Sequence, residues 1–293
     1  MALVKDDASM TDNSSNRAVP TSRYNYAELA DVYNRAREDY IVPMPMNARR
    51  MQEYVTAYDV DLDMSYLAME PTEDIVNGVC MLGVRDNRTW ITRLGVIPDR
   101  RRRRSGQFLM DKEIEISRET GKDLVQLEVI KGNEPAHKLF LKLGFEVTRE
   151  LLVIRRPPGP VDESLVPDQM SVQMVNQDEA IGLLAQRELG AAWTEETASL
   201  LNIGNLQGII VTLPDGEMGW VVYQQKAFQL AHFVFAPDIS QAMMRSLLAA
   251  VHTTHKAQDT KIENVPLLHP TWEAYQAMGY VVAFGRIEMV LHL

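Results

Sequence analysis

Five consecutive arginines, Arg100–Arg104, are the residues whose type and spacing most clearly indicate chemistry. They follow an apolar run that ends at Pro98, and they precede Gly106, where a segment of helix-forming residues opens. This order predicts a strand, a basic loop and a helix N-terminus. Backbone N–H groups at a helix N-terminus have no partner within the helix, and guanidinium groups bind phosphate oxygens well. The stretch from Trp90 to Leu109 is therefore predicted to bind a phosphate or pyrophosphate.

The basic loop belongs to a chain that is acidic overall. The sequence has 293 residues, which favours two domains, and a net charge of −10, which disfavours general nucleic-acid binding. We prefer the phosphate interpretation of the arginine run to a nucleic-acid or localisation segment, because the run lies between a strand end and a helix start.

The single cysteine, Cys80, excludes an intrachain disulfide and a multi-cysteine zinc cluster, so no metal site is predicted. Apolar runs are too short to span a bilayer, and Lys5 and Asp6 interrupt any signal-peptide pattern. We expect a cytoplasmic protein with neither membrane nor nucleic-acid partners.

Strands and helices are expected around the basic loop. Residues 1–20 lack periodicity and are predicted to be a flexible tail. Helical periodicity follows from Tyr24, and Asn47 has the position of an N-cap for a second helix. Apolar runs then predict strands at 66–69, 76–84, 90–97, 124–130 and 145–154, with helices after the arginines and at 135–143.

The second half of the chain repeats this order. A proline-rich linker at 157–170 precedes it, and Phe140–Phe145 has a counterpart in Tyr275–Tyr280: an aromatic residue, three helical residues, glycine and an aromatic residue. The proline-to-glycine separation is 144 − 98 = 46 positions in the first copy and 279 − 237 = 42 in the second. We predict an α/β (α+β) protein of two tandem domains, 21–156 and 171–293, each a mixed, mostly antiparallel sheet flanked by helices.

Two motifs in the first half resemble the GNAT superfamily of N-acetyltransferases. Val96-Ile97-Pro98 followed by Arg101 to Gly106 is similar to the strand and loop of its first motif, with Arg104 where the first glycine is usual. The second motif is matched by Leu127-Glu128-Val129, Asn133, Ala136, Phe140 and Gly144-Phe145. The resemblance covers residues 24–156, and the second half is similar to the same fold more loosely.

The resemblance implies a site for acetyl-CoA as co-substrate. It assigns the pantetheine arm to the strand backbone at Leu94, Gly95 and Val96. It assigns the pyrophosphate to the loop formed by Arg101, Arg102, Arg103, Arg104, Ser105 and Gly106, and further cofactor contacts to Asn133 and Phe140.

Glu128 holds the position of the general base in related enzymes, and the alternative is an ion-paired or solvated strand glutamate. Phe140 stands where the family's proton-donating tyrosine is usual, so either solvent or another residue protonates the thiolate, or the chemistry is impaired. His137 is either a proton shuttle or an ordinary helix-surface histidine.

The second copy is predicted to be degenerate. It has Ser240, Met243 and Arg245 where arginine and two glycines would form the loop, and Tyr275 is more simply a core aromatic residue. The expected function is direct transfer of an acetyl group from acetyl-CoA to a primary amine of a small molecule or peptide. The alternative is a non-catalytic acyl-CoA-binding or regulatory protein, and homodimer formation is left open.

Overall fold

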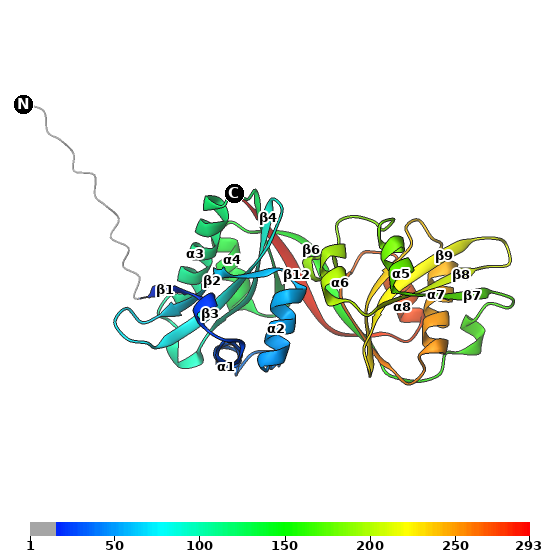
Figure 1. Ribbon diagram of the computed structural model, residues 1–293, viewed down its shortest axis with the longest axis horizontal. Helices are drawn as coiled ribbons and strands as arrows, with labels where there is room; N and C mark the ends of the chain where they lie inside the picture. Colours follow the sequence, from blue (N-terminus) through cyan, green and yellow to red (C-terminus); the bar gives the residue numbers. More distant parts are fainter. Residues whose placement is uncertain (1–15) are drawn as a thin grey trace, which may run out of the picture. The chain divides into compact units, whose positions relative to one another are not determined.

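A computed structural model describes residues 16–293, except for the side chain of Glu163. The chain divides into two compact units, and each is described by itself (Figure 1). The first unit contains the described residues up to Met51, with 61–82 and 91–121. The second contains 52–60, 83–90 and 122–293. Within residues 16–293, no helix combines the length and the apolar character needed to cross a membrane.

The first unit is built around the opening strands of the chain. Its elements are β1 (Arg17–Pro20), η1 (Thr21–Arg23), α1 (Tyr26–Ala36), η2 (Pro98–Arg100), α3 (Ser105–Glu119) and parts of α2 (Ala48–Ala57), β2 (Val60–Met69), β3 (Val76–Arg85) and β4 (Arg88–Val96). Strand β1 pairs antiparallel with β2, from Arg17 opposite Met69 to Pro20 opposite Tyr66. The tail prediction was therefore wrong for residues 17–20, where Val19 is buried; residues 1–15 of the predicted tail lie outside the described residues.

Asparagine side chains fix the helices before the sheet. Asn25 and Glu28 form a capping box at the start of α1. The Asn34 amide bonds both the N–H and the carbonyl of Met46, which holds the proline-interrupted segment in place. The prediction of an N-cap at Asn47 is confirmed, because its Oδ1 accepts a hydrogen bond from the Arg50 N–H at 2.9 Å.

Two glycines allow close backbone approach near the end of β4. A Cβ atom on Gly95 would lie 2.9 Å from the Cβ of Ala36, and one on Gly78 would lie 2.6 Å from the Gly95 carbonyl oxygen. Larger side chains would push α1 away from β4 and β3 away from β4. The strand that precedes the basic loop is therefore positioned by close packing from two sides.

The second unit contains the remaining elements. They are β5 (Leu124–Ile130), α4 (Glu134–Lys142), β6 (Glu146–Arg156), η3 (Glu163–Leu165), β7 (Ser171–Val175), α5 (Gln177–Leu184), η4 (Trp193–Glu195), α6 (Thr197–Ile203), β8 (Leu206–Thr212), β9 (Met218–Gln225), β10 (Gln229–Phe235), α7 (Gln241–Thr254), β11 (Asp259–Pro266), α8 (Thr271–Ala277) and β12 (Val281–His292). Its strand order is β5-β12-β6-β11-β10-β9-β8-β7. Neighbouring strands are antiparallel except β10 and β11, so the prediction of a mixed, mostly antiparallel sheet is confirmed.

The last strand is exchanged between the two sequence copies. Strand β12 lies between β5 and β6, with Arg286 opposite Ile130 and His292 opposite Leu124 on the β5 side. Strand β6 in turn lies between β12 and β11. Figure 1 shows β12 in red running beside β6. Each copy thus contributes a strand to the other copy's part of the sheet, which the sequence patterns did not predict.

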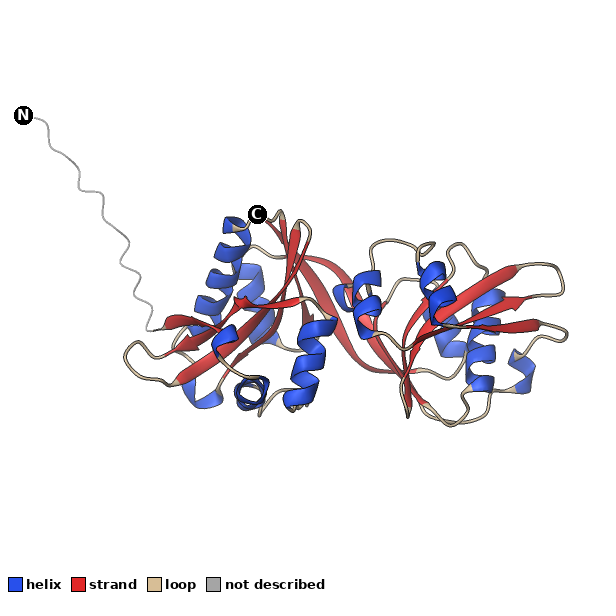
Figure 2. Ribbon diagram, in the orientation of Figure 1, coloured by secondary structure: helices blue, strands red, loops and turns tan. Residues whose placement is uncertain are grey.

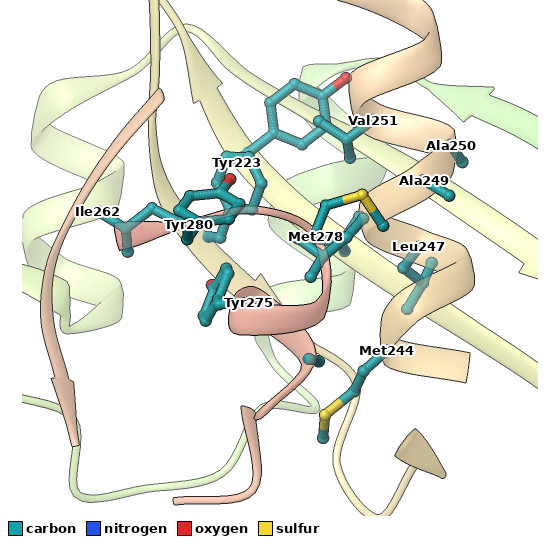
Figure 3. Close-up of a cluster of buried hydrophobic side chains, with 14 of the residues drawn as sticks. Tyr223, Met244, Leu247, Ala249, Ala250, Val251, Ile262, Tyr275, Met278 and Tyr280 are labelled. Atoms are coloured by element: carbon teal, nitrogen blue, oxygen red, sulfur yellow. The ribbon is translucent and has the colours of Figure 1, made fainter. Parts of the chain in front are cut away.

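Helices cover both faces of strands β8 to β10 (Figure 2). On one face, α7 and α8 pack with buried residues that include Val221 and Tyr223. On the other face, α5 and α6 pack with Trp220 and Val222. Consecutive side chains of β9 therefore point to opposite faces of the sheet, and both faces are buried. Figure 3 shows part of the first cluster, where Tyr275 and Tyr280 lie near residues of β9, α7 and β11.

Glu113 on α3 is fully buried, and burial raises the pKa of its carboxyl well above the ordinary value of 4.5. Its neutral form is therefore favoured in the folded protein, so the free energy of unfolding should fall as the pH rises above about 4.5, by at most about 1.4 kcal/mol per pH unit. Glu113→Gln removes this titration. Urea unfolding at pH 5 and pH 7.5 should show the variant gaining stability relative to the wild type at the higher pH; equal pH dependence would contradict the expectation.

Candidate active site

The basic loop between β4 and α3 has the backbone of a glycine-containing turn. Arg102 and Arg104 have φ angles of 66° and 59°, in the left-handed region. This conformation costs a non-glycine residue about 1–2 kcal/mol. Arg104 is the N-cap residue of α3, and its own side chain makes no capping hydrogen bond. Arg104 therefore keeps the backbone conformation that glycine adopts most easily, and adds a positive charge at the helix N-terminus.

Three of the five arginines are bound by carboxylates of the chain. Arg101 makes two hydrogen bonds of 2.6 Å to Asp39, and this pairing lowers the pKa of the Asp39 carboxyl. Arg100 and Arg103 both pair with Glu70. These partly exposed pairs contribute little stability and serve mainly to orient the loop.

Arg102 and Arg104 differ from the other three arginines. Both are exposed, and neither forms an ion pair with any residue from 16 to 293. The loop consequently carries two uncompensated guanidinium groups beside an uncapped helix N-terminus, which is a favourable environment for a phosphate.

Asn16 holds the loop from the strand side. Its Oδ1 accepts hydrogen bonds from Ser105 at 3.1 Å and from the Asn77 amide at 2.9 Å, and its amide donates to the Arg103 carbonyl at 3.5 Å. The sequence analysis missed this residue because it falls within the expected tail. An asparagine just before a short alternating apolar segment is the only local signal there.

Glu128 on β5 has the environment of a base that works near neutral pH. Its Oε2 accepts a hydrogen bond of 2.7 Å from the Trp90 indole N–H, and its Oε1 is buried with no hydrogen bond in the described part of the chain. Burial raises the pKa of the carboxyl to about 7, and the positive charge of Arg286 and the Trp90 hydrogen bond oppose the increase. A proton can therefore be taken up and released near pH 7.

The charges around Glu128 come mainly from the exchanged strand β12. Glu288 lies directly opposite Glu128 and accepts hydrogen bonds from Arg149 at 2.8 and 2.9 Å. Arg286 bonds Glu263 at 2.6 Å and Asn264 at 2.8 Å. Sequence analysis missed Arg286 and Glu288, although two charged residues alternating in an apolar strand were the available signal.

An aromatic group orients the Trp90 indole. The Trp90 ring stacks on the Trp193 ring, with 5.7 Å between the ring centroids and an angle of 14° between the ring planes. The Trp193 indole donates to the Tyr58 carbonyl at 2.9 Å, and the Arg85 guanidinium lies 4.3 Å from the Trp193 ring centroid. Trp193 follows the proline-rich linker, so its contribution here was not predictable from local spacing.

The remaining predicted residues lie in three kinds of environment. Leu94, Gly95 and Val96 are half-buried at the end of β4, and Gly106 is half-buried in the first turn of α3. Asn133 caps α4, accepting a hydrogen bond from the Ala136 N–H at 3.4 Å. Phe140 is buried, with its ring centroid 6.1 Å from that of Phe145, and the His137 Nε2 is buried without a hydrogen bond among residues 16–293.

Comparison with known proteins gives a family match and similar folds. Residues 29–145 match the acetyltransferase (GNAT) family. Comparison with curated protein sequences gives no significant match.

Solved structures show the same fold over nearly the whole chain. A GCN5-related N-acetyltransferase from Sphaerobacter thermophilus aligns with a TM-score of 0.68 and 13% identity, covering 95% of this chain and 96% of its own. A tandem GNAT protein from the clavulanic acid biosynthesis pathway aligns with a TM-score of 0.66 and 15% identity, covering 94% and 98%. The prediction of tandem GNAT-like domains is thereby confirmed at the level of the fold.

If Arg102 and Arg104 bind phosphate, Arg102→Gln and Arg104→Gln should each weaken acetyl-CoA binding by about fivefold to tenfold, because a charge-assisted contact is lost. Arg104→Gly should weaken it similarly, since it keeps the backbone and removes only the charge. Arg118→Gln, at the far end of α3, is the matched control. Calorimetric affinities equal to that of the wild type for all three loop variants would refute the assignment.

Proposed function

We propose that this protein transfers an acetyl group from acetyl-CoA directly to a primary amine of a small-molecule or peptide acceptor. The observation that carries the proposal is the pair of uncompensated arginines, Arg102 and Arg104, at the uncapped N-terminus of α3. The GNAT family match of residues 29–145 supports acyl transfer as the reaction class. The pyrophosphate of the cofactor is the anion that such a loop fits.

Glu128 is the proposed general base. A primary amine is mostly protonated at neutral pH and must lose a proton before it attacks the thioester carbonyl. A carboxylate with a pKa of about 7 holds that proton and releases it to solvent in each turnover. The new C–N bond forms as the C–S bond breaks, and the electron pair of that bond leaves with the CoA sulfur.

Protonation of the leaving thiolate is assigned to water. Phe140, at the position of the family's usual donor, has no transferable proton and lies buried against Phe145. A thiolate is a stable leaving group, so the reaction proceeds without a dedicated acid. Backbone N–H groups near Val96 are proposed to polarise the thioester carbonyl. The cytoplasmic location expected from the sequence is where this co-substrate would be available.

A thiol-release assay tests the function. The full chain is mixed with acetyl-CoA and a panel of polyamines, aminoglycosides and peptides with free α-amino groups, and free CoA is measured. Amine-dependent release supports the transferase. Binding of acetyl-CoA with no release for any acceptor would instead favour the non-catalytic acyl-CoA-binding alternative.

With an acceptor from that panel, kcat/KM should rise with pH through about 7, because Glu128 must be deprotonated to act. Glu128→Gln should reduce kcat/KM by about 100-fold or more above pH 7 and abolish this inflection. Trp90→Phe is the matched variant: it removes the hydrogen bond that favours the carboxylate, so the inflection should move to higher pH. An unchanged profile in Glu128→Gln would make Glu128 a structural residue.

A further inference from the structure

The second sequence copy contains a cavity of about 380 Å³ between β10 and β11. These parallel strands pair only at Gln229 with Asp259 and at Leu230 with Thr260, and then separate. Each strand is irregular beyond that point, and His232 and Asn264 have positive φ angles of 55° and 58°. The cavity is large enough for a small organic molecule.

This cavity lacks the phosphate-binding end of a CoA site. The N-terminus of α7, the counterpart of α3, is capped by Ser240, whose Oγ accepts from the Met243 N–H at 3.0 Å. The Glu217 carboxylate accepts from the Ser240 N–H at 3.0 Å and from its hydroxyl at 2.8 Å. A carboxylate of the chain therefore stands where a pyrophosphate would have to bind, and like charges exclude it. The occupant of the cavity must be a different and smaller molecule.

Most charged groups in the cavity wall are already paired. Glu195 accepts from the His232 ring at 3.0 Å, and Glu263 pairs with Lys261 and Arg286, which lower its pKa against the effect of burial. Arg149, also in the wall, is bound to Glu288. The other carboxylates of the wall, Glu188 and Asp238, are exposed, and Glu188 lies 3.7 Å from His269.

Arg187 is the other arginine of the wall. Its Nη1 donates to the Glu195 backbone carbonyl at 2.6 Å, and no carboxylate of residues 16–293 forms an ion pair with it. Burial lowers the pKa of the guanidinium, and the negative charges of Glu195 and Glu196 partly oppose this decrease. A partly buried guanidinium is stabilised by a carboxylate that bonds its remaining N–H groups.

Much of the rest of the wall is apolar, although Glu188, Asp238 and His269 also line it. Phe233, Phe235, Ile239, Met244, Val265 and Tyr275 line it, and Tyr275 is fully buried. A ligand that fills the cavity would remove its own apolar surface from water while its charged end meets Arg187.

We propose that this cavity is a binding site for a small organic acid, with its carboxylate on Arg187 and an aliphatic or aromatic body between β10 and β11. The site is separate from the proposed acetyl-CoA loop and does not depend on the proposed function. In this proposal the second copy binds a small organic acid and not acetyl-CoA.

Calorimetry on the full chain without CoA tests the proposal. The probes are linear carboxylates from butanoate to decanoate and 3-phenylpropanoate, with 3-phenylpropanamide as the neutral match. At least one carboxylate should bind, and 3-phenylpropanoate should bind more tightly than its amide. Arg187→Gln should weaken carboxylate binding roughly tenfold or more, whereas Arg245→Gln on α7 should leave it unchanged.

A second variant keeps the test decisive if Arg187→Gln unfolds. Ala236→Leu keeps Arg187 and places bulk in the cavity wall, so it should weaken the larger probes more than butanoate. Thermal unfolding confirms that each variant is folded. The proposal is overturned if no carboxylate binds, if acid and amide bind equally, or if a folded Arg187→Gln binds as the wild type does.

Discussion

The insertion of β12 between β5 and β6 is the constraint on which the rest of the second unit depends. A strand inside a sheet needs backbone partners on both edges, because buried N–H and carbonyl groups without hydrogen bonds are costly. Strands β5 and β6 cannot pair with each other while β12 lies between them. The sheet around Glu128 is therefore complete only when residues from the end of the chain are in place.

The inserted strand also decides the chemistry available to Glu128. Arg286 favours its carboxylate form, whereas burial and Glu288 favour the protonated form. Arg149 holds Glu288 by two hydrogen bonds, and Glu263 and Asn264 hold Arg286. A pKa near neutrality is thus the balance between burial, which raises it, and several fixed charges, most of which belong to elements distant in sequence.

The sequence predicts the features of the fold and site that neighbouring residues determine. It does not predict the contacts between residues that lie far apart along the chain. The loop and helix at Arg100–Gly106, the cap at Asn47 and most strands follow from neighbouring residues, and the structure has them where the patterns place them. The pairing of Gln126 with Glu288 spans 162 positions, and no local pattern specifies which strand edge the last segment joins. Trp193 reaches Trp90 for the same non-local reason, so Glu128 was predictable and its partners were not.

The Glu217 carboxylate at the start of α7 has a consequence for how the two copies can change over time. A tethered anion competes with a diffusing one at a very high effective concentration, so it occupies the helix end almost permanently. Arginines and glycines introduced into that loop would still leave the helix end occupied by Glu217 unless this residue were replaced as well. A phosphate site at this helix end would therefore need at least two substitutions, one that removes the Glu217 carboxylate and one that adds positive charge.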